Sequence, residues 1–470
     1  MQSTEKLKIN LDKQMITSFK IYHMGNIKHL MLYVVLLTCL VGCKKGKEAD
    51  YDDNFHPRII DNNGVFTSPN RIIFQGQSAI YSGLAFSPKP IEKTKISWKV
   101  NNKEVSTDTT FTFAPVAGGE YEIKVEATYN GQTSTRISKV LVSPSTYTPK
   151  TFTNVAVAYL TENAVAASVD YATVTHIVYT GARVTPTGAV DFSKGNQAQN
   201  LDEQVARAHI NKVPLLLGVT GTLSGIDGWS LYNNADFGSV ISDPVKRVAL
   251  ATTIAQYVTD HKVDGVDILM TDLGNDDAAI TNKNMQSIGP FLSLLRTALP
   301  TQLLTVSVTT NYLHWDYPVA DFAKADWVNV HAYEDGVHVG PDAPRGQPSG
   351  FDFMVAGADI WKNKMPKEKI VIGIPAFGLR YNEINAAGNN LGWGSYDYMP
   401  FKDILSLDPN AHQKEMSDIK FGVYYNGIPL VDKKAAYIKS NGFKGAYLYA
   451  GDYDVKGANS LMGAIYKTLN

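Results

Sequence analysis

Acidic side chains stand within or just after two short apolar runs, and their carboxyl groups are the groups in this chain best suited to acid–base chemistry. Asp267 lies inside the run 265–270, and Asp272 follows that run. Glu334 comes just after the run 327–332. A carboxyl group can donate or accept a proton during a reaction, or stabilise a positive charge. These positions are therefore the first candidates for a functional site.

Other kinds of site lack a supporting pattern. The histidines are scattered, and His331 and His338 have no spaced partner that would support a metal site. The sequence shows no phosphate-binding loop and no order of Ser, His and Asp that indicates a nucleophilic triad. We therefore expect neither a metal ion nor an organic cofactor.

Residues 151–470 must form the body that positions these carboxylates. Short β-branched runs alternate there with amphipathic stretches such as 245–259 and 284–298, which is typical of a parallel sheet with helical crossovers. Eight runs are expected to form strands: 155–160, 176–180, 213–219, 265–270, 304–309, 327–332, 370–374 and 445–449. They predict a (β/α)8 TIM barrel with a small insertion, from 381 to about 431, between strands seven and eight. The site of such a barrel lies at the C-terminal ends of its strands.

A smaller β domain is expected over residues 57–143, where apolar and polar residues alternate with period two around Trp98 and Ile123. Gly118-Gly119 and Asn130-Gly131 supply turn signals between such runs. The pattern predicts an antiparallel sandwich with Trp98 in its core, and the segment resembles Ig-like and PKD-like modules. A spacer role is favoured over a binding role, and the segment 143–149 is expected to be a linker.

The N-terminus predicts export. An apolar run over 30–40 follows Lys28 and is too short to span a bilayer, as in a secretory signal. Leu40-Val41-Gly42-Cys43 resembles the bacterial lipobox, so residues 1–42 are expected to be a lipoprotein signal peptide and Cys43 the lipidation site. Residues 43–56 would form a tether. The predicted location is a bacterial outer membrane or cell surface; the alternative is a plain signal peptide with an incidental cysteine.

Composition excludes several classes of protein. The chain has 470 residues, 44% of them hydrophobic, which is too many for a disordered protein. Its formal net charge of −1 gives no general attraction to nucleic acid or anionic lipid. Only two cysteines are present, so no disulfide framework is available.

The segment 263–268, Val-Asp-Gly-Val-Asp-Ile, resembles the start of the fourth-strand motif of family 18 glycoside hydrolases, the chitinases and endo-N-acetylglucosaminidases. Further pieces follow in that family's order: Gly228-Trp229, Asp243-Pro244, 326–334, 370–378, 425–429 and 445–449. The resemblance covers about 320 residues and implies a TIM barrel that binds N-acetylglucosamine-containing glycans.

Two departures from the family's motif, Asp-Gly-x-Asp-x-Asp-x-Glu, bear on catalysis. Leu269 stands at the third Asp and Thr271 at the Glu, so no catalytic residue is assigned. In the family that Glu is the general acid, and the neighbouring Asp orients the substrate's N-acetyl group, whose oxygen is the nucleophile. Neither Leu269 nor Thr271 can do this chemistry.

Other carboxylates could restore the chemistry only from unusual positions. Asp272 should point away from the barrel mouth, because successive side chains of a strand alternate between its faces. Asp276 and Asp277 lie in the following loop and could reach back. Glu334 replaces an Asp near the family's acetamide site, but it lies on another strand.

Aromatic rings and hydrogen-bonding groups commonly line saccharide clefts. The candidate ligand-binding residues are Tyr159, Trp229, Asp267, Trp315, Tyr333, Glu334, Trp393, Tyr447 and Tyr449. Ordinary packing explains any one of these aromatics equally well, and Asp267 could instead support the barrel interior. Strand eight also has a Tyr where the family usually has a Trp.

We therefore interpret the chain as a lipid-anchored, non-catalytic carbohydrate-binding protein that captures chitin oligomers or N-glycans for a bacterial uptake system. Two alternatives remain open: an active glycosidase with a relocated acid, and a scaffold that binds another protein. Fold alone does not separate these classes.

Overall fold

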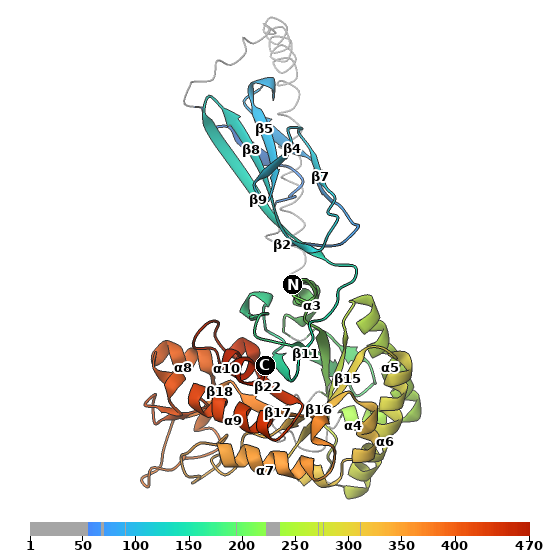
Figure 1. Cartoon of the computed structure of the whole chain (residues 1–470), viewed down its shortest axis with the longest axis vertical. Coiled ribbons are helices and arrows are strands. Elements are labelled where there is room, and N and C mark those ends of the chain that lie inside the picture. Colours follow the sequence, from blue (N-terminus) through green and yellow to red (C-terminus); the bar gives the residue numbers. More distant parts are fainter. Residues whose placement is uncertain are drawn as a thin grey trace, which may run out of the picture. The chain divides into compact units, whose positions relative to one another are not determined.

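The computed structural model describes residues 55–66, 70–89, 91–193, 195–221, 236–270, 272–275, 277–310 and 312–470. The predicted leader, Cys43 and most of the predicted tether lie outside these residues. The described residues form a set of N-terminal β-sheets and a C-terminal barrel, and each is treated separately (Figure 1). None of the described helices is long and apolar enough to cross a bilayer.

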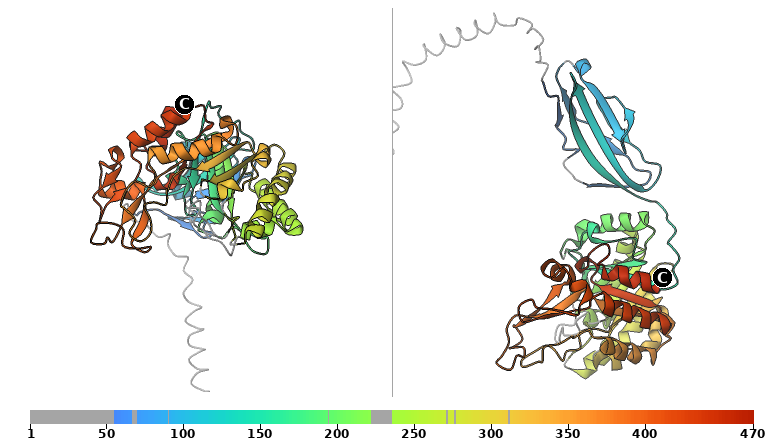
Figure 2. Two further views of the ribbon diagram at one scale, coloured as in Figure 1. Left: turned by 90° about the horizontal axis from the view of Figure 1, so that it is seen from below. Right: turned by 60° about the vertical axis from the view of Figure 1, so that its left-hand side comes forward.

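The N-terminal region is all-β within its described residues. Its strands are β1 (Arg58–Asp61), β2 (Asn70–Phe74), β3 (Ala79–Tyr81), β4 (Leu84–Ser87), β5 (Lys95–Val100), β6 (Lys103–Ser106), β7 (Phe111–Phe113), β8 (Gly119–Tyr129) and β9 (Gln132–Ser143). The largest sheet has the order β2-β9-β8-β5-β6, and Figure 2 shows its long strands β8 and β9 side by side. The pairing of β2 with β9 is parallel, whereas the sequence pattern predicts an antiparallel sandwich.

Trp98 lies in the core of this region, as predicted. Its side chain is fully buried, with its ring 5.6 Å from that of Tyr81 and 5.3 Å from that of Phe111. The described sheets do not by themselves define an Ig fold, so that class stays a prediction.

Eight parallel strands close into a barrel in the C-terminal part, which confirms the predicted barrel. They are β10 (Val155–Leu160), β11 (His176–Val184), β13 (Leu215–Thr220), β14 (Gly265–Leu269), β15 (Leu303–Thr309), β16 (Trp327–His331), β17 (Ile370–Pro375) and β22 (Gly445–Tyr449). The barrel closes because β10 pairs with both β11 and β22. The two-residue strand β12 (Val190–Asp191) adds an antiparallel edge to β11.

Helices cover the outside of the barrel. They are α3 (Gln197–Ile210), α4 (Asp236–Ile241), α5 (Pro244–Asp260), α6 (Ala278–Ala298), α7 (Phe351–Lys362), α9 (Ile428–Ser440) and α10 (Leu461–Leu469). Figure 1 shows α5 and α6 on one flank and α9 and α10 beside β22. Helix α6 begins earlier than the expected residue 284, because the side chain of Asp277 accepts a hydrogen bond from Ala279 N–H at its start.

The predicted insertion between β17 and β22 contains a small antiparallel sheet, whose first strand begins at Phe377 rather than at 381. Its elements are β18 (Phe377–Tyr381), β19 (Tyr396–Pro400), α8 (Phe401–Leu407), β20 (Met416–Ser417) and β21 (Val423–Tyr424). The strand order is β19-β18-β21-β20.

Alternating side chains of the barrel strands enter two different apolar cores. On β14, Val266 and Ile268 join the large core between strands and helices, whereas Leu269 joins a smaller core inside the barrel. Gly265 at the start of β14 is required sterically, because a Cβ atom there would lie 2.2 Å from the carbonyl oxygen of Leu303. The start of β14 thus lies tightly against β15.

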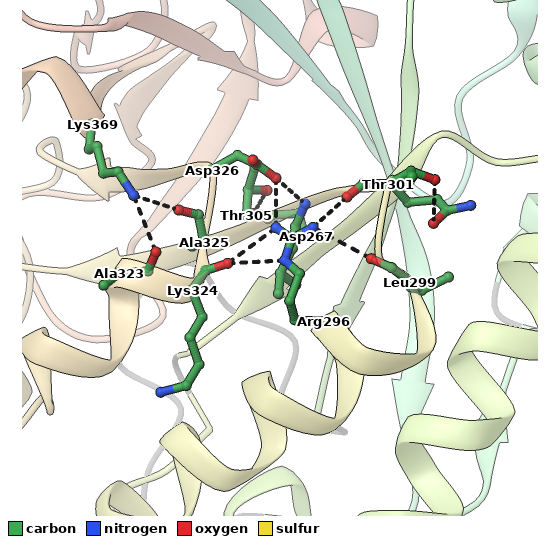
Figure 3. Close-up of polar contacts among 12 residues, drawn as sticks. Asp267, Arg296, Leu299, Thr301, Thr305, Ala323, Lys324, Ala325, Asp326 and Lys369 are labelled. Carbon is green, nitrogen blue, oxygen red and sulfur yellow. Dashed lines mark hydrogen bonds and ion pairs between the residues drawn. The ribbon is translucent and has the colours of Figure 1, made fainter.

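Arg296, near the end of α6, joins the helix to the N-terminal ends of β15 and β16 (Figure 3). Its guanidinium donates hydrogen bonds to the backbone carbonyls of Leu299, Gln302 and Lys324. It also lies 2.9 Å from the Asp326 carboxylate. These bonds provide donors for backbone carbonyl groups that precede β15 and β16 and would otherwise be unpaired.

We predict that Arg296→Met lowers the free energy of unfolding by about 1–3 kcal/mol, because it leaves several backbone carbonyls without their donor. The measurement is urea denaturation followed by circular dichroism. Lys467→Met, at an exposed position of α10, is the control and should change the value by less than about 0.5 kcal/mol. Equal urea concentrations at the midpoint of unfolding for the two variants would contradict this role of Arg296.

Candidate functional site

Asp267 lies inside the barrel and its carboxylate is fully hydrogen-bonded by protein groups. One oxygen accepts bonds from the hydroxyls of Tyr159 and Ser307, each at 2.8 Å. The other accepts from Thr305 Oγ1 at 2.5 Å and Asn329 Nδ2 at 3.0 Å. Complete burial raises the pKa of Asp267, and these bonds offset part of the increase. The geometry gives Asp267 a supporting role within the barrel.

Leu269 is the next inward-facing residue of β14 and presents only hydrocarbon. Its side chain is 2% exposed, packs in the core inside the barrel and borders the mouth. Thr271, the other departure from the motif, lies outside the described residues. A buried Leu at this position can neither hydrogen-bond an amide nor stabilise a cation.

Asp272 follows β14, which ends at Leu269, and its side chain is buried. Its carboxylate accepts a hydrogen bond from the backbone N–H of Phe237 in α4. It also lies against Gly221, where a Cβ atom would be 1.6 Å from Asp272 Oδ2. The Asp277 carboxylate accepts a hydrogen bond from Ala279 N–H at the start of α6. Asp276 lies outside the described residues.

A cleft of about 350 Å³ opens at the C-terminal ends of β10, β11, β13, β14 and β22. Its charged side chains are Glu162, Arg183, Lys402 and Asp452, two acidic and two basic. Arg183 pairs with Glu162 at 3.2 Å, and the Asp452 carboxylate accepts bonds from the N–H and hydroxyl of Thr161. The cleft is therefore polar, with its charges already balanced.

Sequence analysis missed this charged set, although a signal existed for part of it. Glu162 and Asp452 come just after predicted strands, where barrel sites lie. Arg183 had no such signal, because β11 extends beyond the predicted run 176–180.

The predicted aromatic residues separate into three groups. Tyr159, Tyr333 and Tyr447 are at most 2% exposed and pack on one another, with ring centroids 4.8 and 6.3 Å apart. Tyr449 is partly exposed and lines the cleft. Trp315 and Trp393 are 75% and 64% exposed, after β15 and in the insertion. Trp229 lies outside the described residues.

A continuous row of rings leads from the barrel interior onto the sheet of the insertion. Tyr333 lies 5.9 Å from Phe377, which lies 5.3 Å from Tyr398. Tyr398 is in turn 6.3 Å from Tyr396, on the same face of β19. Three of these four residues were not predicted. The alternating tyrosines of 396–400 were a signal of a strand face, but only the pairing of β18 with β19 brings them to Phe377.

Comparison with known proteins identifies the family. The profile described as "Glycosyl hydrolases family 18" matches residues 155–454, which span the barrel from its first strand to beyond its last. The chain belongs to this family.

Three known proteins illustrate what the chain is similar to. A "chitinase-like effector" of Moniliophthora roreri is 27% identical over 222 residues, which make up 43% of this chain and 52% of that protein. A chitinase structure from Bacteroides thetaiotaomicron has a TM-score of 0.55 at 22% identity, covering 67% of this chain and 96% of that one. A plant class V chitinase mutant from Cycas revoluta, in complex with (GlcNAc)3, has a TM-score of 0.55 at 19% identity. The match covers 67% of this chain and 100% of that one.

The chain spans about half the length of the first curated relative. The similarity to solved structures, all below 25% identity here, shows the fold alone. The described residues contain no group of three or more His, Cys, Asp or Glu side chains that could hold a metal ion.

A buried network holds the family 18 segment that carries Glu334. Glu334 has a positive φ of 66°, its N–H donates to Ser349 Oγ, and its carboxylate lies 3.2 Å from His331 Nε2. The carbonyl oxygen of Ser349 accepts hydrogen bonds from Lys434 Nζ at 2.6 Å and from Asn426 Nδ2 at 3.2 Å. Lys434 in α9 therefore helps to fix the segment after β16.

Lys434 should make stability depend on pH. Complete burial lowers its pKa from 10.5 to about 7. Between these values the unfolded chain binds a proton that the folded protein does not, so the free energy of unfolding should rise with pH, by at most about 1.4 kcal/mol per pH unit. Lys434→Met should remove this rise, measured by urea denaturation from pH 6 to 10.

The neighbouring residue gives a matched control for this prediction. Lys433 is exposed and contacts the ring of Phe351, so Lys433→Met should keep the pH dependence of the native protein. An unchanged slope in Lys434→Met would contradict the assignment of the effect to the buried amine.

Proposed function

We propose that this family 18 barrel binds an N-acetylglucosamine-containing glycan, such as a chitin oligomer or an N-glycan, without hydrolysing it. The observation that most strongly supports this proposal is the buried, apolar Leu269 at the inward-facing position that follows Asp267 on β14. General acid–base catalysis is typically worth 10²–10⁴-fold, and the charge of an intermediate needs support as well. Leu269 supplies neither.

The other carboxylates do not offer an obvious replacement in this proposal. Asp267 is saturated by four protein donors, and Asp272 faces the backbone of α4 instead of the barrel interior. Glu334 contacts His331 on its own segment. Among the described residues, a relocated acid would have to come from the cleft, where Glu162 is already paired with Arg183.

Several features support a glycan as the ligand. The cleft combines balanced charges with the partly exposed ring of Tyr449, and the row of rings reaches the half-exposed Tyr398. Aromatic faces pack against the apolar faces of sugar rings, and paired charges suit a neutral ligand. The Cycas revoluta relative carries (GlcNAc)3, and the Moniliophthora roreri relative is named as chitinase-like.

Calorimetry and a sensitive hydrolysis assay, both with chitotetraose and an N-glycan, test the proposal. We expect saturable binding and no turnover above that of buffer. Turnover that Asp272→Asn, Glu334→Gln or Glu162→Gln abolishes would show a relocated acid and overturn the non-catalytic assignment. Absence of binding to any glycan would instead favour the protein-binding scaffold.

Tyr449 provides a sharper test of where the glycan lies. Tyr449→Ala should weaken chitotetraose binding by about tenfold, because it removes the apolar ring face that the proposal places against a sugar ring. Tyr466→Ala removes a partly buried tyrosine of α10 and is the control. Equal affinities of the Tyr449→Ala variant and the native protein would place the ligand elsewhere.

The proposal extends to location: diacylated Cys43 would anchor the protein to a bacterial outer membrane or cell surface, where it would hand glycans to uptake proteins. Cys43→Ser should therefore move the protein from the membrane fraction to the soluble fraction and abolish labelling by radioactive palmitate in a bacterial host. Cys39→Ser, four residues earlier, is the matched control and should keep both the membrane location and the palmitate labelling. Palmitate labelling that survives Cys43→Ser would contradict the anchor.

A further inference from the structure

Arg183 reaches the cleft because β11 contains an irregularity. The pairing of β11 with β13 shifts register between Tyr179 and Ala182, and Gly181 within the shift has a φ of +124°. Thr180 lines the cleft, Ala182 enters the outer core, and Arg183 lines the cleft again. A regular strand would have turned Arg183 toward the helices, so the extra residue re-aims this side chain.

Thr220 is the register partner of Arg183 on the neighbouring strand β13, and it lines the same cleft. Arg183 is 9% exposed and Thr220 is 4% exposed. Arg183 Nε and Thr220 Oγ1 are both buried, and neither has a hydrogen-bond partner within the part of the chain that the structure describes. Buried polar atoms are normally paired, so two unpaired atoms on register partners that line one cleft need an explanation.

The surrounding charges indicate what would pair with these two atoms. The guanidinium already has Glu162 at 3.2 Å, and the cleft as a whole holds two basic and two acidic side chains. An anionic group would add to the charge of Glu162 and Asp452. A neutral oxygen that accepts two hydrogen bonds and donates none, such as an amide carbonyl, fits two adjacent donors best.

We propose that Arg183 Nε–H and Thr220 Oγ1–H bind the carbonyl oxygen of an N-acetyl group of the glycan, and so select N-acetylated sugars. The inference rests on the proposed glycan-binding function and adds to it a specificity-determining pair on β11 and β13. In the free protein the two donors are unsatisfied, and the ligand supplies their acceptor.

The experiment compares chitotetraose with cellotetraose, which has hydroxyl groups in place of the N-acetyl groups, by calorimetric competition on the full chain. The native protein should prefer chitotetraose. Thr220→Val should weaken chitotetraose binding by about 3- to 10-fold and Arg183→Lys by about tenfold or more. Both variants should lose most of the preference for chitotetraose over cellotetraose. Thr252→Val, on the exposed face of α5, is the control and should keep both quantities within twofold.

Thermal denaturation of the free variants separates recognition from a merely structural role. Since Val removes an unsatisfied buried hydroxyl, the Thr220→Val variant should have a Tm equal to or above that of the native protein. A Tm lowered by several degrees together with weaker binding would overturn the inference. An equal loss of affinity for the two tetraoses, or unchanged chitotetraose affinity in both variants, would also overturn it. No binding of chitotetraose by the native protein would instead mean that the proposed glycan-binding function is wrong.

Discussion

A carboxylate enclosed in a barrel of parallel strands must be satisfied by hydrogen bonds, since burial without partners would cost several kcal/mol. Asp267 meets this requirement through hydroxyl and amide groups from β10, β15 and β16. These bonds tie β14 to strands on both sides of the barrel, and they set which residues of β14 face inward. The inward-facing place of Leu269, two residues along the strand, follows from that orientation.

This orientation decides which side chains of β14 meet the mouth of the barrel. The inward position after Asp267 is occupied by Leu269, while the acidic Asp272 is directed at the backbone of α4. Each charged group described at the mouth, Glu162, Arg183, Lys402 and Asp452, takes part in at least one ion pair or hydrogen bond. The described side chains of the mouth therefore combine balanced charges with the partly exposed ring of Tyr449.

The rim of the barrel depends on contacts between segments far apart in the sequence. The segment with Glu334 is held by Ser349, whose carbonyl is bound by Lys434 from α9. The insertion places Phe377 and Tyr398 against Tyr333. The N-terminal ends of β15 and β16 are held in turn by Arg296 of α6. The mouth and the opposite end of the barrel are thus stabilised by different sets of polar contacts.

The sequence by itself determined the barrel and its family. Periodicity of two within strands and alternation of strands with helices are local properties, and they survive in a single sequence. Only the tertiary structure decided that Tyr159, Tyr333 and Tyr447 pack on one another, that Lys434 is buried, and that Gly181 turns Arg183 into the cleft beside Thr220. These features arise from strand register and from a bulge, which depend on neighbours that lie tens to hundreds of residues away along the chain.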